Sequence, residues 1–250
     1  MSESQVYVVT GASKGLGRSI CEILATNGFT VVGIARNSIE LSSLENYLKK
    51  TNPKSTTFAC DLSSENQIAT TGAKITHDFP VIHGLIHNAG IIGPVGSMFN
   101  VETNLWNETI QVNLLAVQQL TKLLYTSMVK AQRCRVTTIS SGAAVNSLES
   151  WSAYCTSKAG LEMWTRSLAD EGSSHGISAV SVAPGIVDTD MQATIRSVSV
   201  DDFPMVERFI GFHKNGDLVA PDAVAESLYE LITSHSMDDS GNRFDVRELE

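Results

Sequence analysis

The chain has 250 residues, of which 42% are hydrophobic and 18% charged, so it can bury one sizeable core and is not a disordered protein. Its 18 basic and 27 acidic residues give a net charge of −9, which argues against a protein that binds nucleic acid. No apolar run approaches the roughly 20 residues that cross a bilayer, and the first residues carry no basic charge, so we expect a cytoplasmic protein that binds no membrane.

Short β-branched runs alternate with longer segments of helical period along the chain. The runs that have the composition of buried parallel strands are 5–10, 30–35, 55–60, 81–87, 134–140 and 177–183. The helices predicted between them are 15–27, 38–51, 64–78, 103–131 and 152–174. Strands that alternate with helices form a parallel sheet through right-handed crossovers. The sequence therefore predicts a doubly wound α/β fold of the Rossmann type.

The last quarter of the chain departs from this alternation. We interpret 188–213 as a small helical flap over the substrate site of a single domain, 1–250, followed by a helix near 221–235 and an edge strand near 242–246. Residues 201–250 hold 12 acidic and 4 basic side chains, so they carry most of the net charge. The rest of the chain is nearly neutral, which is compatible with an anionic ligand there.

The cysteines and histidines show no metal-binding pattern. Cys21, Cys60, Cys134 and Cys155 stand far apart and form no CxxC pair, which predicts buried free thiols. The 6 histidines lack the spacing of metal ligands, so we expect no metal site.

A glycine-rich run, TGASKGLG at 10–17, follows the first predicted strand and opens the first predicted helix. Glycines let the backbone approach a pyrophosphate closely, and the helix N-terminus favours its negative charge. A lone run of this kind also fits an ordinary turn, but the strand and helix units that follow favour a dinucleotide site. The predicted contacts are Gly11, Ser13, Lys14, Gly15, Leu16 and Gly17.

Arg36 and Asn37 follow the second strand, where chains that bind NAD tend to place an acid for the adenosine ribose. An arginine there offers a planar fork to a 2′-phosphate, and Lys14 offers a second cation. NADP(H) is therefore the predicted cofactor. The alternative is an arginine that meets only solvent, as most arginines do.

Residues after the third and fourth strands are candidates for the adenosine half of the cofactor. Asp61, followed by Leu62, is placed to accept a hydrogen bond from the adenine amino group, although the pair also fits a helix N-cap. Asn88, Ala89 and Gly90 follow the fourth strand, where small residues form either a wall for ribose and adenine or a tight loop.

The strongest signal is a serine, a tyrosine and a lysine near the fifth strand. Ser141 ends that strand, and Tyr154 and Lys158 stand four residues apart at the start of the next helix, hence on one face. A neighbouring ammonium lowers the pKa of a phenol from about 10, which suits proton donation to a carbonyl. For the tyrosine and lysine alone, an exposed helix face is the alternative. Asn113, among apolar neighbours, is either a satisfied structural amide or holds a water at the site.

Together, TGASKGLG, HNAG, Asn113, Ser141, Tyr154 with Lys158, and PGIVDTDM resemble the short-chain dehydrogenase/reductase family over almost the whole chain. The resemblance implies that Tyr154 is the acid, Lys158 its modulator and a ribose ligand, and Ser141 the carbonyl anchor. It implies that Asn113 is the water-holding amide of a proton relay. The further cofactor contacts that it implies are Pro184, Gly185, Val187, Thr189 and Met191. His87 departs from the second asparagine that the family often has.

The last quarter, with PGIVDTDMQ, KNGDLV and SGNRFDV, looks like the sepiapterin reductase and benzil reductase branch of that family. This implies a vicinal diketone such as benzil, or a pterin-like dicarbonyl, as substrate, with Trp151 and Met205 in an apolar wall. Asp245 matches the position where sepiapterin reductases place a carboxylate for the pterin amino group. The alternative for Asp245 is a solvated acid in an acidic tail.

We therefore expect an NADPH-dependent carbonyl reductase that acts on a small molecule, with Tyr154 as the proton donor. One alternative is an NAD(P)-linked alcohol dehydrogenase that runs oxidatively, and Arg36 and Lys14 argue against its NAD-linked form. Another is a non-catalytic NADP-sensing protein of the same fold, against which the intact catalytic set argues. The family resemblance also implies a homodimer, formed through the long helices 103–131 and 152–174.

Overall fold

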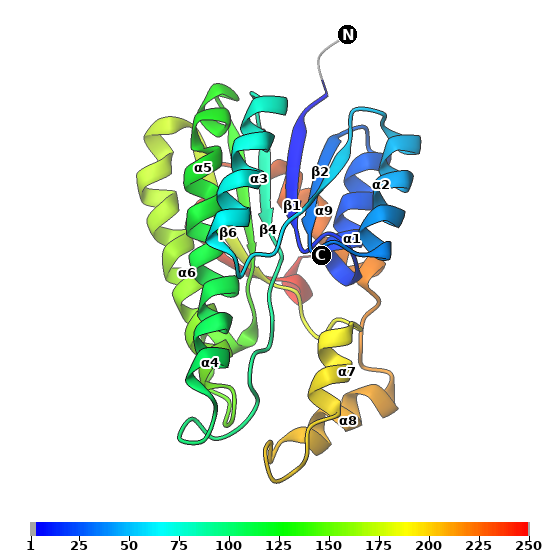
Figure 1. The fold of residues 1–250 in the computed structure, drawn as a ribbon, viewed down its shortest axis with the longest axis vertical. Coiled ribbons are helices and arrows are strands. Elements are labelled where there is room, and N and C mark those ends of the chain that lie inside the picture. Colours follow the sequence, from blue (N-terminus) through cyan, green and yellow to red (C-terminus); the bar gives the residue numbers. More distant parts are fainter. Residues whose placement is uncertain (1–3, 250) are drawn as a thin grey trace.

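The computed structural model describes residues 4–249, which form a seven-stranded sheet with helices on both faces (Figure 1). The strand order is β3-β2-β1-β4-β5-β6-β7, and each neighbouring pair is parallel. The strands are β1 Val6–Thr10, β2 Thr30–Ala35, β3 Thr56–Ala59, β4 Gly84–His87, β5 Cys134–Ile139, β6 Ile177–Ala183 and β7 Arg243–Asp245. The order reverses between β1 and β4, where doubly wound folds bind their ligands. The predicted Rossmann-type fold is confirmed.

Apolar strand residues account for the burial of the sheet on both faces. Every residue of β2 and of β6 is buried, as expected for parallel strands that are covered by helices on each side. One face packs against α1 Gly15–Thr26, α2 Ile39–Thr51 and α9 Pro221–Ser234. The opposite face packs against α3 Glu65–Asp78, α5 Ala116–Lys130 and α6 Ser152–Gly172 (Figure 1).

The predicted helix 103–131 differs from the structure in a way that concerns Asn113. The segment forms α4 Thr103–Ile110, a π-helical turn Gln111–Leu115, and then α5. A single continuous α-helix is therefore the wrong description. A π-helical turn carries one extra residue, which changes the direction of the side chains on its two sides, and such turns are frequent at functional sites.

The segment between β6 and α9 leaves the sheet and forms α7 Asp190–Arg196 and α8 Val206–Asn215. A parallel bridge between Val187 and Val219 closes its base. In Figure 1 both helices project beyond the carboxyl ends of the strands, at the same end of the molecule as α4. The short 3₁₀ turns are η2 Gly142–Ala144, η3 Ser173–His175 and η4 Val246–Glu248.

The cysteines agree with the sequence expectation at three of four positions. Cys21, Cys60 and Cys134 are buried free thiols as predicted, whereas Cys155 is partly exposed. Within residues 4–249, no group of three His, Cys, Asp or Glu side chains is arranged to hold a metal ion. No helix in that part of the chain has both the length and the hydropathy of a membrane span.

Candidate active site

The glycine-rich loop joins β1 to α1 at the carboxyl edge of the sheet. Gly11 and Gly15 have φ angles of +65° and +53°, which disfavour any side chain. A Cβ atom on Gly17 would lie 2.2 Å from the Gly11 carbonyl oxygen, so only glycine fits. Leu16, in contrast, places its side chain in the core, so only its backbone can reach a ligand.

The N-terminus of α1 is prepared for an anion. Its N-cap residue, Lys14, makes no side-chain capping bond, and the first turn carries no acidic side chain. The first N–H groups of a helix lack intrahelical partners, so a phosphate can accept hydrogen bonds from them and interact with the positive end of the helix dipole. The close glycine packing and this uncapped N-terminus together fit a dinucleotide pyrophosphate.

Asn88 attaches the loop after β4 to the glycine loop. Its side-chain amide donates to the carbonyl oxygens of Thr10 and Gly11 at 3.0 and 3.3 Å. The Thr10 hydroxyl in turn accepts from the backbone N–H groups of Asn88 and Ala89, both at 3.1 Å. These bonds join the two loops at the point where the strand order reverses, and doubly wound folds bind their ligands in a crevice at that point.

Gly90 lies farther along this loop, beside the catalytic candidates. A Cβ atom added to Gly90 would lie 3.4 Å from Asn113 Oδ1 and 3.5 Å from Lys158 Nζ. The structure therefore places Gly90 beside Asn113 and Lys158, whereas its predicted place was at the adenosine half of the cofactor.

Asn113 lies in the π-helical turn and is buried. Its Oδ1 accepts from the Ile91 backbone N–H at 2.8 Å, and its Nδ2 donates to the Ile91 carbonyl at 2.9 Å and to Ser157 Oγ at 3.0 Å. The amide is thus a satisfied structural group that joins the loop after β4 to α6. Both of its donors are used by protein atoms.

Ser141, Tyr154 and Lys158 converge at the end of β5. Ser141 follows β5 and caps η2, where its hydroxyl oxygen accepts from the Ala143 N–H at 3.1 Å. Tyr154 and Lys158 lie on one buried face of α6 and point to the same strand end. The ammonium of Lys158 donates to the Ile139 carbonyl at 2.8 Å and lies 5.7 Å from the centroid of the Tyr154 ring.

Burial dominates the electrostatics of this group. It raises the pKa of Tyr154 to about 12, against a smaller lowering by the hydrogen bond with Ser141. Burial also lowers the pKa of Lys158 to about 8, and the negative charge of Glu162 opposes that change. The expectation of a lowered phenol pKa is therefore wrong, because desolvation of the phenolate outweighs the effect of its neighbours.

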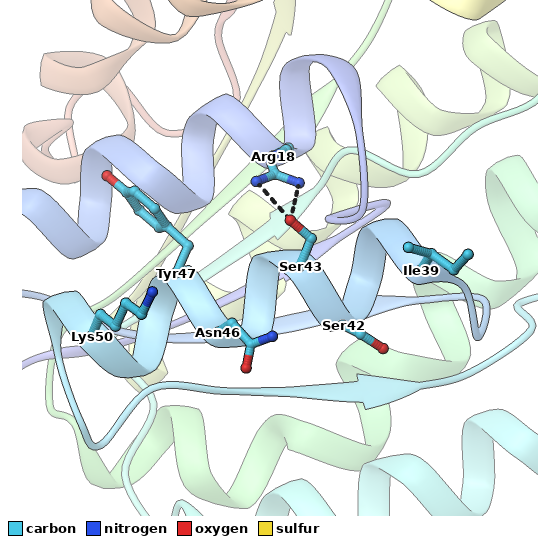
Figure 2. Close-up of a pocket in the computed structure, with 7 residues that line it drawn as sticks. All are labelled: Arg18, Ile39, Ser42, Ser43, Asn46, Tyr47 and Lys50. Carbon is cyan, nitrogen blue, oxygen red and sulfur yellow. Dashed lines mark hydrogen bonds between the residues drawn. The ribbon is translucent and has the colours of Figure 1, made fainter.

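Charged side chains at the adenosine end of the crevice are exposed. Arg36 and Asn37 follow β2 and face solvent. Lys14 forms an ion pair with Asp190 at the start of α7, and both side chains are more than half exposed. Near them, a surface groove of about 480 Å³ runs between α1 and α2 (Figure 2). Its lining residues are Arg18, Ile39, Ser42, Ser43, Asn46, Tyr47 and Lys50.

Asp61 makes local contacts after β3. Its Oδ1 accepts from the backbone N–H and the hydroxyl of Ser63 at 2.9 and 2.8 Å, and the backbone bond is the main reason that its pKa is lowered. The N-cap of α3 is Ser64, so the N-cap alternative for Asp61 is wrong. Leu62 packs against the core.

The loop after β6 approaches the glycine loop. Gly185 has a φ of +73°, and Val187 is buried in the core. A Cβ atom added to Gly15 would lie 3.1 Å from Thr189 Cγ2, so Thr189 lies directly over the glycine loop. Thr189 and Gly15 thus bring the two loops into contact, whereas the Val187 side chain points into the core.

Tyr154 belongs to an aromatic cluster that joins the start of α6 to the segment between β6 and α9. Trp151 stacks on Phe203 with ring centroids 5.3 Å apart, and it contacts Phe209 at 5.3 Å and Tyr154 at 5.6 Å. Met191 and Met205 pack against the edge of this cluster. Phe203 is fully buried and is not among the predicted site residues, although an isolated aromatic residue in a polar stretch was a signal for it.

Asp245 does not offer a free carboxylate. It is buried at the end of β7, and it accepts from Arg247 Nε at 2.7 Å and Nη2 at 2.5 Å. The hydrogen bond with Arg247 is the main reason that its pKa is lowered. The solvated-acid interpretation is therefore wrong, and both carboxylate oxygens already accept hydrogen bonds from Arg247.

Comparisons with known proteins agree with this geometry. A family model described as short chain dehydrogenase matches residues 5–199. A benzil reductase ((S)-benzoin forming) of Bacillus subtilis (strain 168) is 33% identical over 252 residues, with 98% of this chain and 99% of that protein covered. A benzil reductase of Bacillus cereus is 34% identical, with 90% and 92% covered. The crystal structure of the KRED1-Pglu enzyme superposes with a TM-score of 0.87 at 32% identity, with 96% and 100% covered.

Proposed function

Because the chain belongs to the short-chain dehydrogenase family, in its benzil reductase branch, it is an oxidoreductase, and we propose that it reduces the carbonyl group of a small molecule with NADPH. The observation that carries the proposal is the convergence of Ser141, Tyr154 and Lys158 at the end of β5, in the same crevice as the uncapped N-terminus of α1. A bound NADPH would supply the hydride that reduces the carbonyl carbon.

Tyr154 is assigned as the acid that protonates the carbonyl oxygen. A pKa raised to about 12 keeps the phenol protonated at neutral pH, so the proton is present when the substrate arrives. The Ser141 hydroxyl, which interacts with the phenol, holds the carbonyl oxygen beside it. As the proton leaves, the Lys158 ammonium stabilises the phenolate that forms.

The choice of NADPH over NADH is assigned to exposed cations. Arg36, at the end of β2, is placed for the 2′-phosphate of the adenosine ribose, and Lys14 lies in the neighbouring glycine loop. An acid at the end of β2 would repel that phosphate, and this chain has none there.

The substrate class is inferred from the aromatic side chains that pack around Tyr154. The rings of Trp151, Phe203 and Phe209 pack closely, and Tyr154 in the same cluster is only 7% exposed, so we infer that residues 188–213 act as a flap that moves when a substrate binds. An aromatic vicinal diketone would pack its own rings against these side chains once the flap has opened. The Bacillus relatives named benzil reductase support this class, whereas the bond between Asp245 and Arg247 argues against a pterin.

The test is to incubate the purified protein with benzil and NADPH, follow cofactor oxidation, and separate the benzoin product on a chiral column. We expect turnover of benzil to exceed that of sepiapterin, and NADPH to be preferred over NADH. Faster oxidation of benzoin than reduction of benzil would favour the alcohol dehydrogenase alternative. Binding of NADPH with no turnover of any carbonyl would make the protein a cofactor sensor.

We also infer a homodimer formed through α5 and α6. These helices and the adjoining π-helical turn expose apolar side chains at Leu115, Tyr125 and Met163. Burial of such residues favours association. Sedimentation velocity should show a dimer that Met163→Glu weakens, and a monomer at all concentrations would contradict the inference.

A further inference from the structure

A buried carboxylate on α6 lies one turn beyond Lys158. Glu162 follows Tyr154 and Lys158 at the same four-residue spacing, so the three side chains share one buried face of the helix. The side chain of Glu162 is 7% exposed. An ionised group at such a position is costly unless hydrogen bonds and an opposite charge compensate for lost water.

Two neighbouring strands supply that compensation. Glu162 Oε1 accepts from the Ser140 hydroxyl on the β5 end at 2.6 Å and from Arg243 Nε on β7 at 2.8 Å. Glu162 thus links α6 to the end of β5 and to the edge strand.

The last residue of β5 and the two residues that follow it are each held by a different residue of α6. The Ile139 carbonyl accepts from Lys158, the Ser140 hydroxyl donates to Glu162, and the Ser141 hydroxyl interacts with Tyr154. These three contacts together set the position of Ser141 relative to Tyr154 and Lys158. Among the three residues of α6, Glu162 is the one without an assigned role in the reaction.

We propose that Glu162 is a positioning residue for the reduction, which fixes the end of β5 against α6 and keeps Lys158 in its ammonium form. This inference rests on the carbonyl reductase function proposed above. Glu162 acts through Lys158 and Ser140 and touches no reacting atom itself.

The sign of its electrostatic effect follows from the groups around it. Lys158 lies on its own helix, Arg243 faces it from β7, and β5 contributes the neutral Ser140 hydroxyl. Burial lowers the pKa of Lys158 to about 8, and the charge of Glu162 raises it. Removing the carboxylate would leave Lys158 in the same buried environment without that negative charge, so the ammonium would lose its proton at lower pH.

The experiment measures Lys158 directly in the cofactor-free protein. NMR of ¹³Cε-labelled lysine follows its titration, with the resonance assigned from its absence in Lys158→Arg. In Glu162→Gln we expect the Lys158 pKa and the alkaline limb of kcat/KM to move to lower pH by about one unit. Glu162→Asp keeps the charge, so its Lys158 pKa should stay close to that of the parent protein. Glu171→Gln is the matched control, because Glu171 is an exposed acid on the same helix.

A second variant predicts the opposite sign. Arg243→Gln removes the positive partner and leaves the carboxylate of Glu162, so the Lys158 pKa and the alkaline limb should move to higher pH. A purely structural link would lose stability in both variants without opposite shifts. Opposite shifts therefore support the proposal, and shifts of the same sign, or none beyond those of Glu171→Gln, overturn it. If Glu162→Gln does not fold, Arg243→Gln alone tests the proposal: an upward shift of the Lys158 pKa supports it, and no shift overturns it.

The positioning of β5 is tested separately by Ser140→Ala. Loss of a hydrogen bond to a charged group should lower kcat about 10-fold, with the alkaline limb unmoved. Unchanged kcat would remove this half of the proposal. If the protein reduces no carbonyl, the proposed function fails, while the NMR titrations still decide whether Glu162 controls Lys158.

Discussion

The two ends of the crevice differ in how they hold their charges. At the catalytic end, Tyr154 and Lys158 are buried and contact the end of β5 through fixed hydrogen bonds. At the adenosine end, Arg36 and Lys14 are exposed. Electrostatic interactions are strong and geometrically defined in a region of low dielectric constant, whereas solvent and salt screen exposed ones. The buried end is therefore suited to chemistry, and the exposed end to selecting a cofactor by charge.

The largest effect should come from the buried end. Tyr154→Phe keeps the ring and its contact with Trp151 but removes the acid, so turnover should fall by roughly 100-fold or more. NADPH binding, measured by fluorescence titration, should survive. Lys158→Ala should reduce both, because the ammonium is assigned to the tyrosine and to the ribose. Near-normal reduction by the phenylalanine variant would remove Tyr154 from the mechanism.

Burial at this end also predicts a pH dependence of stability. His87, at the end of β4, is buried against Thr121 and Trp164, and burial lowers its pKa to about 3. An unfolded histidine titrates near 6.5, so below that pH the unfolded chain binds a proton that the folded chain excludes. Stability contributed by neutral His87 is therefore present above about pH 6.5 and is lost as the pH falls towards 3.

His87→Asn tests this dependence. It removes the titrating group, so the free energy of unfolding should fall less steeply with decreasing pH than in the parent protein. The difference should reach up to about 1.4 kcal/mol per pH unit. Urea denaturation between pH 7 and pH 5 measures it. Equal slopes for the two proteins would show that His87 already titrates normally in the folded state.

The fold and most of the crevice follow from local features of the sequence. Buried parallel strands are continuous apolar runs, and the glycine loop needs residues without side chains at given places. Tyr154 and Lys158 meet because four residues make about one helical turn. Such features depend on a few neighbouring residues, so one sequence is enough to predict them.

What the sequence did not predict depends on contacts between distant segments. The ion pair between Lys14 and Asp190 joins residues 176 positions apart. Asn113 in the π-helical turn bonds to the Ile91 backbone, and the raised pKa of Tyr154 comes from burial in a cluster that includes Phe203 and Phe209. Asp245 is different, because its partner Arg247 is two residues away and basic, a local signal that the resemblance to pterin-binding enzymes obscured.

A smaller effect is expected when the exposed end is altered. Arg36→Asp should weaken NADPH binding about 10-fold and leave NADH binding almost unchanged, since it replaces an attraction to the 2′-phosphate by a repulsion. The difference should shrink at high salt. Arg133→Asp is the matched control, because Arg133 is also exposed but lies at the amino end of β5. Equal use of both cofactors by the parent protein would contradict this role for Arg36.

The smallest effect should come from the ion pair between Lys14 and Asp190. Asp190→Asn removes an exposed acid that competes with a phosphate for the Lys14 ammonium. Exposed pairs contribute about 0.2 to 1 kcal/mol, so NADPH binding should tighten by no more than about five-fold, with little change for NADH. The gain should disappear at high salt and in a Lys14→Gln background, because it acts through that ammonium. A gain that persists without Lys14, or that applies equally to NADH, would mean that Asp190 acts by holding α7 closed over the crevice and not by engaging Lys14.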